Sequence, residues 1–511
     1  MTTTMTSDLN RRPRGSAATA PARWWWLLGA AALLPVADGR TTIALAAWLA
    51  PALLLRYVRE ERAGWGLAVA WGLLTLAHGI GFRGMIPIPG IAYYIFLPVS
   101  GLMATLPYAA DRFWTPRLPG WAATLVFPCA LAAEQFAYGF GPQGTWGAVA
   151  YSQAGDLPLL QILSVTGLAG IAFLVGWVAA ATNRGWEQRR LRPLAPALLA
   201  LTAVVLAGGA RLAFFPPQSA TVRVAGLSPF DSTRQASPTL PDGILAGTAT
   251  PAQVATFRAG SLAAGDALLQ RSAQQAAAGA RIVFWSETAD YVLAADEPSL
   301  LARGEALARA DHIYLGMALG AWTPGAARPL RNELVLITPA GQIGWQYLKA
   351  HPTPGPEAAV AARPDGRLRE LDTPWGRIAG AICYDMDFPR LLAQAGRGRA
   401  DLVLSPAGDW PAIDPRHTEM AGFRAIEQGF NLVRQSHDGR SAAYDYEGRL
   451  LGQMDQFHAQ DLALVAEVPT RGVATVYAWL GDGFAWLCLA GIVALGVAAM
   501  RRRPGGGRFP K

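Results

Sequence analysis

The amino-acid sequence predicts a multi-span α-helical membrane protein that carries one large α/β domain outside the membrane. The 511 residues are 52% hydrophobic and 16% charged, and the mean hydropathy of +0.22 is too high for an ordinary soluble protein. Apolar runs gather before residue 215 and after residue 476, whereas residues 216–475 mix polar and apolar side chains. The net charge of +8 comes from arginines clustered beside apolar runs, which indicates membrane topology and not a nucleic-acid partner.

Seven apolar stretches precede the mixed segment and an eighth follows it. They cover residues 24–37, 42–55, 64–81, 85–110, 120–138, 158–182, 193–215 and 476–500. A helix needs about 20 residues to cross the hydrocarbon core, so the first two stretches are short and could form one hairpin that does not cross fully. We predict a seven-helix transmembrane domain over 24–215 and a last transmembrane helix over 476–500.

Basic residues predict the orientation of these spans. With the N-terminus in the cytoplasm, eighteen basic residues lie on the cytoplasmic side, and the short outer loops hold only Arg40 and Arg83. The cytoplasmic set is Arg11, Arg12, Arg14, Arg23, Arg56, Arg59, Arg62, Arg112, Arg117, Arg184, Arg189, Arg190, Arg192, Arg501, Arg502, Arg503, Arg508 and Lys511. This asymmetry predicts eight spans, cytoplasmic tails over 1–23 and 501–511, and residues 216–475 on the outer side. The alternative, with the large domain inside, would reverse every loop.

The segment 216–475 alternates short apolar runs with helical patterns. Strands are predicted at 221–227, 281–285, 312–319, 332–338, 342–348, 376–383, 401–405, 431–436, 441–446 and 462–468. Helices are predicted at 251–279, 298–310 and 416–429. Alternating β and α elements over about 250 residues indicate one layered α/β domain.

Three reactive side chains lie at the ends of predicted strands. Glu287 follows "RIVFW", Lys349 follows "QIGWQYL", and Cys383 ends "GRIAGAIC". Layered α/β domains place reactive groups at such strand ends, so the three are expected to converge. Singly, the cysteine could be core packing and the glutamate a solvated cap. Lys349 stands out because the chain has only one other lysine, Lys511.

An acid, an amine and a thiol in one pocket form a chemically coherent set. A thiol near its reference pKa is mostly protonated at neutral pH, and a carboxylate can take its proton as general base. A compact ammonium can stabilise the developing oxyanion, a task that the larger, forked guanidinium of arginine fits poorly. Cys129 and Cys488 lie in apolar runs, where a thiol behaves as a small hydrophobe. No spacing in the sequence indicates a metal or cofactor site.

Three motifs carry a resemblance to a known superfamily. "FWSETADY" (284–291), "YLKAHPTPGPE" (347–357) and "GAICYDMDFPR" (380–390) resemble the Glu–Lys–Cys triad of the nitrilase superfamily. With its membrane segments, the whole chain resembles the apolipoprotein N-acyltransferase family. The resemblance implies an αββα sandwich with Glu287 as base, Lys349 as amine and Cys383 as nucleophile. It further matches Glu357 to a second essential glutamate and Tyr384 to the tyrosine after the nucleophile.

The resemblance also implies a reaction and a location. An acyl chain would pass from a phospholipid to Cys383 as a thioester, and then to the N-terminal amine of a diacylated apolipoprotein, without a cofactor. The expected protein is a monomer in the bacterial cytoplasmic (inner) membrane, with its catalytic domain on the periplasmic side. Two alternatives stay open at this point. One is a membrane-tethered amidase that gives the thioester to water, and the other is a catalytically silent subunit of a membrane complex.

Several positions depart from the family pattern. Ser286 stands where proline precedes the base, and Asp385 stands where a glutamate is expected. "PGPE" replaces "PFGE", "AGLSPFDS" (225–232) replaces a Gln-Gly-Asn stretch, and "PAGDW" replaces Asn-Asp-Ala-Trp. These departures indicate either drift within the acyltransferases or a changed substrate. Glu134 lies inside a predicted span, where a carboxylate is either functional or a hydrogen-bonded lock between helices.

Overall fold

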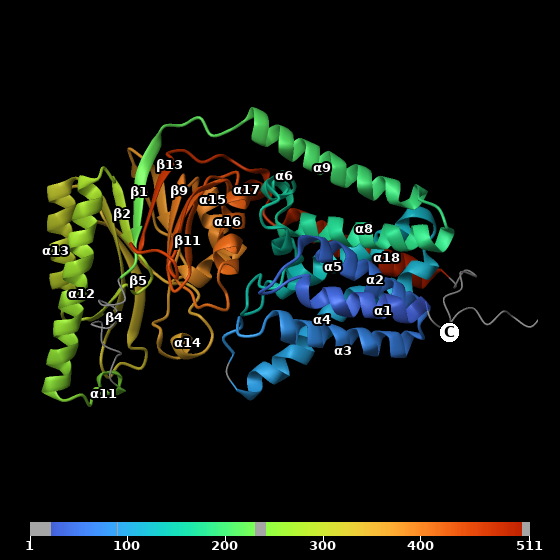
Figure 1. Ribbon diagram of the computed structural model, residues 1–511, viewed down its shortest axis with the longest axis horizontal. Coiled ribbons are helices and arrows are strands. Elements are labelled where there is room, and N and C mark those ends of the chain that lie inside the picture. Colours follow the sequence, from blue (N-terminus) through green and yellow to red (C-terminus); the bar gives the residue numbers. More distant parts are fainter. Residues whose placement is uncertain (1–21, 89, 230–241, 503–511) are drawn as a thin grey trace, which may run out of the picture.

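The computed structural model of the protein describes residues 22–88, 90–229 and 242–502. A helical part and an α/β part lie end to end along the long axis of the molecule (Figure 1). Six of the basic residues predicted to be cytoplasmic lie outside the described residues, namely Arg11, Arg12, Arg14, Arg503, Arg508 and Lys511. The end of the segment 225–232 also lies outside them.

The helical part is built from apolar helices that pack in a bundle. Its elements are α1 (Ala22–Leu33), α2 (Ala44–Glu60), α3 (Ala63–Gly81), α4 (Ile91–Trp114), α5 (Val126–Tyr138), α6 (Leu157–Leu160), α7 (Leu163–Thr166), α8 (Leu168–Gln188), α9 (Ala195–Phe214) and, after the α/β part, α18 (Gly483–Arg501). Among the described residues, four helices are long and apolar enough to cross a membrane: α3, α4 with the turn that follows it, α9 with the turn before it, and α18. A fifth crossing results if α6 to α8 count as one bent span. The eight-span topology stays a prediction.

The stretch 158–182 is not the single helix that its apolar run predicts. The chain bends by 117° between α7 and α8. The break falls at Gly167, whose φ of +60° lies in the region that favours glycine. A Cβ atom at this position would lie 2.5 Å from the Tyr477 ring, so the close packing of the segment after the α/β part also requires glycine here. The sequence signal failed because hydropathy measures length and apolarity, not direction.

The α/β part consists of two sheets packed face to face. The seven-stranded sheet has the order β13-β1-β2-β4-β5-β6, with β3 paired to β4, and the six-stranded sheet has the order β12-β11-β10-β9-β8-β7. The strands are β1 (Thr221–Leu227), β2 (Ile282–Trp285), β3 (Asp290–Leu293), β4 (Tyr314–Trp322), β5 (Leu330–Ile337), β6 (Ile343–Leu348), β7 (Glu370–Thr373), β8 (Gly376–Gly380), β9 (Leu402–Gly408), β10 (Asn431–His437), β11 (Arg440–Tyr444), β12 (Leu450–Asp455) and β13 (Ala463–Pro469). β1, β2 and β4 run parallel, as do β8, β9 and β10.

Helices cover both outer faces of the sheet pair. α12 (Pro251–Ala277) and α13 (Glu297–Asp311) cover the first sheet, and α15 (Pro389–Gly398) and α16 (Arg416–Gln428) cover the second, on the side of the helical part (Figure 1). Fully buried residues of both sheets, such as Phe284, Leu334, Leu404 and Val433, form one core between them. Their burial drives the assembly, since each such side chain contributes about 2 kcal/mol. The domain is therefore the four-layer αββα sandwich that the resemblance implies.

The predicted strands and helices of this domain are present within a few residues. The sequence reading missed β3, β7 and β12, which are short or carry polar residues and lie at or beside sheet edges. The predicted end of the strand that leads to Cys383 is wrong. The strand predicted over 376–383 ends at Gly380, and Cys383 begins a 3-10 turn over Cys383–Asp387 with a φ of +48°.

The loop between α5 and α6 joins the two parts. The Thr145 backbone N–H donates to the carbonyl oxygen of Asp387 at 3.0 Å, and the Trp146 indole donates to its carboxylate at 2.8 Å. Gly144 has a φ of +58°, and a Cβ atom there would lie 2.6 Å from the Asp387 carbonyl oxygen. On the same boundary, Arg416 donates to the carbonyl oxygen of Tyr151 at 2.5 Å. The segment directly after Cys383 is thus hydrogen bonded to the helical part.

Candidate active site

Glu287, Lys349 and Cys383 come together at one edge of the sheet pair. Glu287 follows β2, Lys349 follows β6, and Cys383 lies three residues beyond the end of β8. Lys349 Nζ donates to Glu287 Oε1 at 2.7 Å, and the Cys383 thiol interacts electrostatically with both groups. All three side chains are buried. The edge therefore brings a carboxylate, an ammonium and a sulfur within contact of one another.

Glu357 and Asn332 complete the polar network around the lysine. Lys349 Nζ lies 2.8 Å from Glu357 Oε2, on the short helix α14 (Pro356–Val360), and 3.3 Å from Thr353 Oγ1. The Asn332 amide donates to Glu287 at 2.7 Å and to Glu357 at 2.8 Å. One ammonium and one amide group therefore hold two carboxylates in place. The sequence reading missed Asn332, because an asparagine within a strand carries no signal of its partners.

The charges of the three groups follow from their surroundings. Burial raises the pKa of Glu287, but the Lys349 ammonium and hydrogen bonds from Lys349 and Asn332 outweigh it and lower the pKa overall. Burial lowers the pKa of Lys349, but the two carboxylates raise it well above its ordinary value. Burial and the Glu287 charge raise the pKa of Cys383 well above its ordinary value. The resting site thus holds a carboxylate, an ammonium and a protonated thiol.

A strained turn presents the sulfur of Cys383. Its positive φ is uncommon for a residue with a side chain and costs about 1–3 kcal/mol, which the surrounding contacts must offset. The thiol donates to the carbonyl oxygen of Gly408 at 3.5 Å. The buried carboxylate of Asp385 accepts hydrogen bonds from the backbone N–H groups of Ile382 at 3.0 Å and His351 at 2.7 Å. Asp385, a departure from the family pattern, thus ties the turn that carries Cys383 to the loop after Lys349.

We expect the Asp385→Asn variant to lose about 3 kcal/mol of unfolding free energy. Asp385 also accepts a hydrogen bond from the Tyr347 hydroxyl at 2.7 Å. Because these neighbours are all donors, the N–H groups of an asparagine amide would face them without an acceptor. Thermal unfolding of the detergent-solubilised protein measures the loss as a lower Tm. Asp372→Asn is the matched control, because that carboxylate is 77% exposed and its change should leave Tm unaltered. An unchanged Tm for Asp385→Asn would contradict the bracing role.

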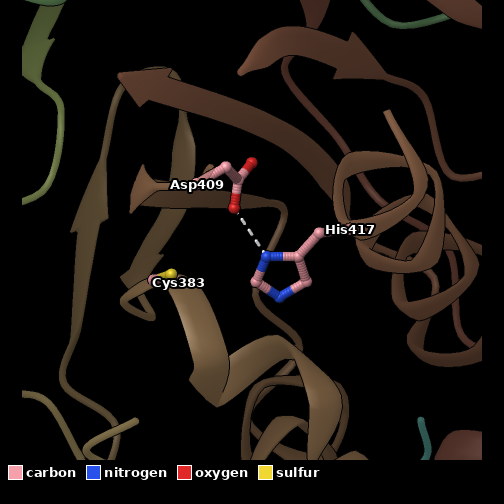
Figure 2. A group of neighbouring side chains, drawn as sticks. All are labelled: Cys383, Asp409 and His417. Atoms are coloured by element: carbon pink, nitrogen blue, oxygen red, sulfur yellow. Dashed lines mark hydrogen bonds and ion pairs between the residues drawn. The ribbon is translucent and has the colours of Figure 1, made fainter. Parts of the chain in front are cut away.

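A second group of buried charges lies next to the sulfur. Figure 2 shows the side chains of Asp409 and His417 joined by a hydrogen bond, with Cys383 beside them. His417 Nδ1 lies 2.7 Å from Asp409 Oδ1, and Nε2 lies 3.0 Å from Asp387 Oδ2. Arg434 Nη2 donates to Asp409 Oδ1 at 2.7 Å. Sequence reading did not single out His417, Asp409 or Arg434.

This group is a charge network, although its atoms are close enough together to suggest a metal site. The ligand atoms of Cys383, Asp409 and His417 lie within 4.8 Å of one another. Both imidazole nitrogens already face carboxylates, and the Arg434 guanidinium occupies the remaining oxygen of Asp409. Burial lowers the pKa of His417, but Asp387 and Asp409 raise it overall. A histidine whose two ring nitrogens both face carboxylates, beside a guanidinium, is a poor metal site, and the guanidinium offsets part of the buried negative charge.

Cys383 and Tyr384 line a cavity that extends among the membrane-type helices. The cavity has a volume of about 170 Å³. Most of its wall is apolar, including Leu74, Phe82 and Leu131. Glu134 also lines it, which places this carboxylate on the cavity wall within a helix. The Tyr384 hydroxyl donates to the carbonyl oxygen of Pro142 at 2.9 Å and so holds the wall to the loop that joins the two parts.

Sequence comparison finds similar proteins over most of the chain. Residues 245–476 match the carbon–nitrogen hydrolase family. The chain is 26% identical over 414 residues to an apolipoprotein N-acyltransferase of Geobacter metallireducens, covering 75% of each chain. It is 29% identical over 532 residues to that of Gloeobacter violaceus, covering 92% of this chain and 95% of the relative. A solved amidase from Nesterenkonia sp. is 18% identical, with a TM-score of 0.39 over 50% of this chain and 92% of that one. The sequence matches confirm the resemblance that the three motifs carry.

Proposed function

We propose that this chain, which carries a carbon–nitrogen hydrolase domain and is similar along most of its length to apolipoprotein N-acyltransferases, acylates the N-terminal amine of diacylated apolipoproteins. The observation that carries the proposal is the position of Cys383 on an apolar cavity shared with membrane-type helices. A nucleophile that received only small soluble amides would not need a cavity continuous with a helical bundle. A lipid acyl chain fits such a wall.

The first half-reaction forms a thioester on Cys383. Glu287 takes the thiol proton while the sulfur attacks an ester carbonyl carbon of a phospholipid. Lys349 stabilises the negative charge that develops on the carbonyl oxygen. The ester C–O bond then breaks, the leaving oxygen receives the proton from Glu287, and a lysophospholipid departs.

The second half-reaction moves the acyl chain to nitrogen. The neutral α-amine of the diacylated acceptor attacks the thioester carbonyl, Glu287 takes a proton from the nitrogen, and the C–S bond breaks. The sulfur regains its proton from Glu287, which restores the starting state and gives ping-pong kinetics. Glu357 and Asn332 hold Lys349 and Glu287 in register, and Tyr384 fixes the cavity wall.

The placement of the chain forms part of the proposal. Four or five apolar helices and the basic residues of their connecting segments support an inner-membrane protein with both termini in the cytoplasm. The proposed divisions are tails over 1–23 and 501–511, a membrane domain over 24–215, a periplasmic catalytic domain over 216–475 and a last span over 476–500. A monomer suffices, because one chain supplies every group of the site.

Intact-mass measurement of the purified protein with a phospholipid tests the proposal. We expect a mass increase equal to one acyl chain, located on Cys383, that disappears when a diacylated lipopeptide is added and reappears as the N-acylated peptide. Loss of the adduct to water alone would favour the tethered amidase. A folded protein without any adduct would favour the silent subunit.

Acyl-enzyme formation should depend little on pH between about 5.5 and 8.5. The pKa of Glu287 lies below its ordinary 4.5, so the base stays ionised throughout this range and loses activity only in more acidic solution. The pKa of Cys383 lies well above 9.0, so the thiol stays protonated. The rate of the mass increase after rapid mixing measures the profile. A rate rising about tenfold per pH unit would instead show a thiolate formed before attack.

A further inference from the structure

A second cavity lies where the helical part meets the α/β part. It has a volume of about 60 Å³. Its wall comes from α5, α8, α15, α18 and the short helix α17 (Val476–Leu480). Phe136, Phe140 and Ala485 give it an apolar surface, whereas Arg390 and Asp482 are charged. It shares wall residues Gln135, Thr145 and Ala148 with the cavity of Cys383, so the α5–α6 loop separates the two.

Arg390 is held in place but keeps its donors free. It stands in the first turn of α15, and its guanidinium carbon lies 3.7 Å from the centre of the Phe140 ring. Its Nε lies 3.9 Å from Asp482 Oδ2, and 57% of the side chain is exposed. The Arg390 guanidinium donates no hydrogen bond to any acceptor within residues 22–88, 90–229 and 242–502. A planar fork with free N–H groups suits the paired oxygens of a phosphate.

The surroundings of Arg390 are those of a lipid–water boundary. The apolar helix α18 begins at Gly483, directly after Asp482, and α5 ends at Tyr138. Aromatic side chains cluster here: the Phe136 ring contacts both Phe140, which is 50% exposed, and Trp486, which is 51% exposed. Tryptophans are enriched where a membrane protein meets lipid headgroups. The cavity thus has its arginine at headgroup level and its apolar wall toward the helices.

We propose that this cavity binds a phospholipid, with the phosphate on Arg390 and an acyl chain along Phe136 and Phe140. The Asp482 carboxylate beside the guanidinium disfavours a second negative charge, so a phosphodiester fits better than inorganic phosphate. This site lies apart from Cys383 and supplies a bound lipid next to the catalytic cavity. It rests on the proposed membrane placement but not on acyl transfer.

Photo-crosslinking tests the site in a protein that cannot turn over. The full-length Cys383→Ala variant in detergent is irradiated with a phosphatidylcholine that carries a diazirine on its acyl chain, and the labelled peptides are mapped by mass spectrometry. Tyr477, Asp482 and Ala485 line only the second cavity, whereas Leu74, His78 and Met85 line only the catalytic one. We expect label on residues 477–486, saturable and displaced by excess unlabelled phosphatidylcholine.

The added change Arg390→Ala should raise the lipid concentration needed for half-maximal labelling of residues 477–486 about tenfold. The label on residues 74–87 should stay unchanged. Arg397→Ala is the matched control, because that arginine is an exposed residue of the same helix and does not line the cavity. Millimolar inorganic phosphate should not compete. Equal labelling of residues 477–486 with and without Arg390, or displacement by inorganic phosphate, would overturn the proposal. Because neither result requires a thioester, failure of this site differs from failure of the proposed reaction.

Discussion

Replacing Cys383 by alanine should abolish the acyl-enzyme and reduce acyl transfer by about a thousandfold or more. In the proposed mechanism the sulfur forms the bond with the acyl carbon, and alanine removes it while leaving Glu287 and Lys349 paired at 2.7 Å. Intact mass with phospholipid and transfer to a diacylated lipopeptide measure the two half-reactions separately. The variant should still insert into membranes, because the methyl group fits the space of the thiol.

Cys129→Ala is the matched control for this variant. Cys129 is also a buried free thiol, but it lies on α5 among apolar residues and lines neither cavity. Its loss should leave the mass increase on Cys383 unchanged. An acyl adduct that persists in Cys383→Ala, or that vanishes in Cys129→Ala, would contradict the assignment of the nucleophile.

Lys349→Arg should slow acyl-enzyme formation by about 100- to 1000-fold although it keeps the charge. Lys349 Nζ reaches Glu287, Glu357 and Thr353 from one point, in a site where the lysine side chain is only 2% exposed. A guanidinium is larger and flat, so it would push the two carboxylates apart and displace the acyl carbonyl from its donor. Stopped reactions analysed by intact mass give the rate.

Two further variants separate the effects of charge and shape at this position. Lys349→Met removes the ammonium and leaves Glu287 and Glu357 as buried carboxylates without a cation, so it should destabilise the fold by about 3–5 kcal/mol as well as stop acylation. Arg397→Lys, the same kind of exchange at an exposed arginine of α15, should change neither Tm nor rate. Near-normal turnover of Lys349→Arg would refute the need for a compact amine.

The sequence could predict the α/β domain because its strands are short apolar runs bounded by polar turns, and burial of those runs sets the fold. Glu287 and Lys349 could be placed for the same reason, since each directly follows such a run. Cys383 could be placed only approximately. Its strand ends at Gly380, and the turn that presents the sulfur depends on hydrogen bonds to Asp385 from the neighbouring Ile382 and from His351, which lies 34 residues away.

The residues that the sequence reading missed are those defined by their partners. Asn332 lies inside a strand, and its role comes from Glu287, 45 residues away, and Glu357, 25 residues away. His417 belongs to a helix and meets Asp387 and Asp409 only in the folded chain. The glycine at the bend, Gly167, likewise leaves room for the ring of Tyr477, which comes from beyond the α/β domain. Local pattern carries no record of such distant contacts.

The backbone of Asp387, four residues from the sulfur, receives its hydrogen bonds from Thr145, a residue of the helical bundle. Contacts from both parts of the molecule therefore hold the segment that follows Cys383. An α/β domain truncated to remove the helical part would keep its core. It would lose the hydrogen bonds from Thr145 that hold the segment after Cys383. An α/β domain separated from the helical part should therefore lose the proposed acyl-transfer activity even if it still folds.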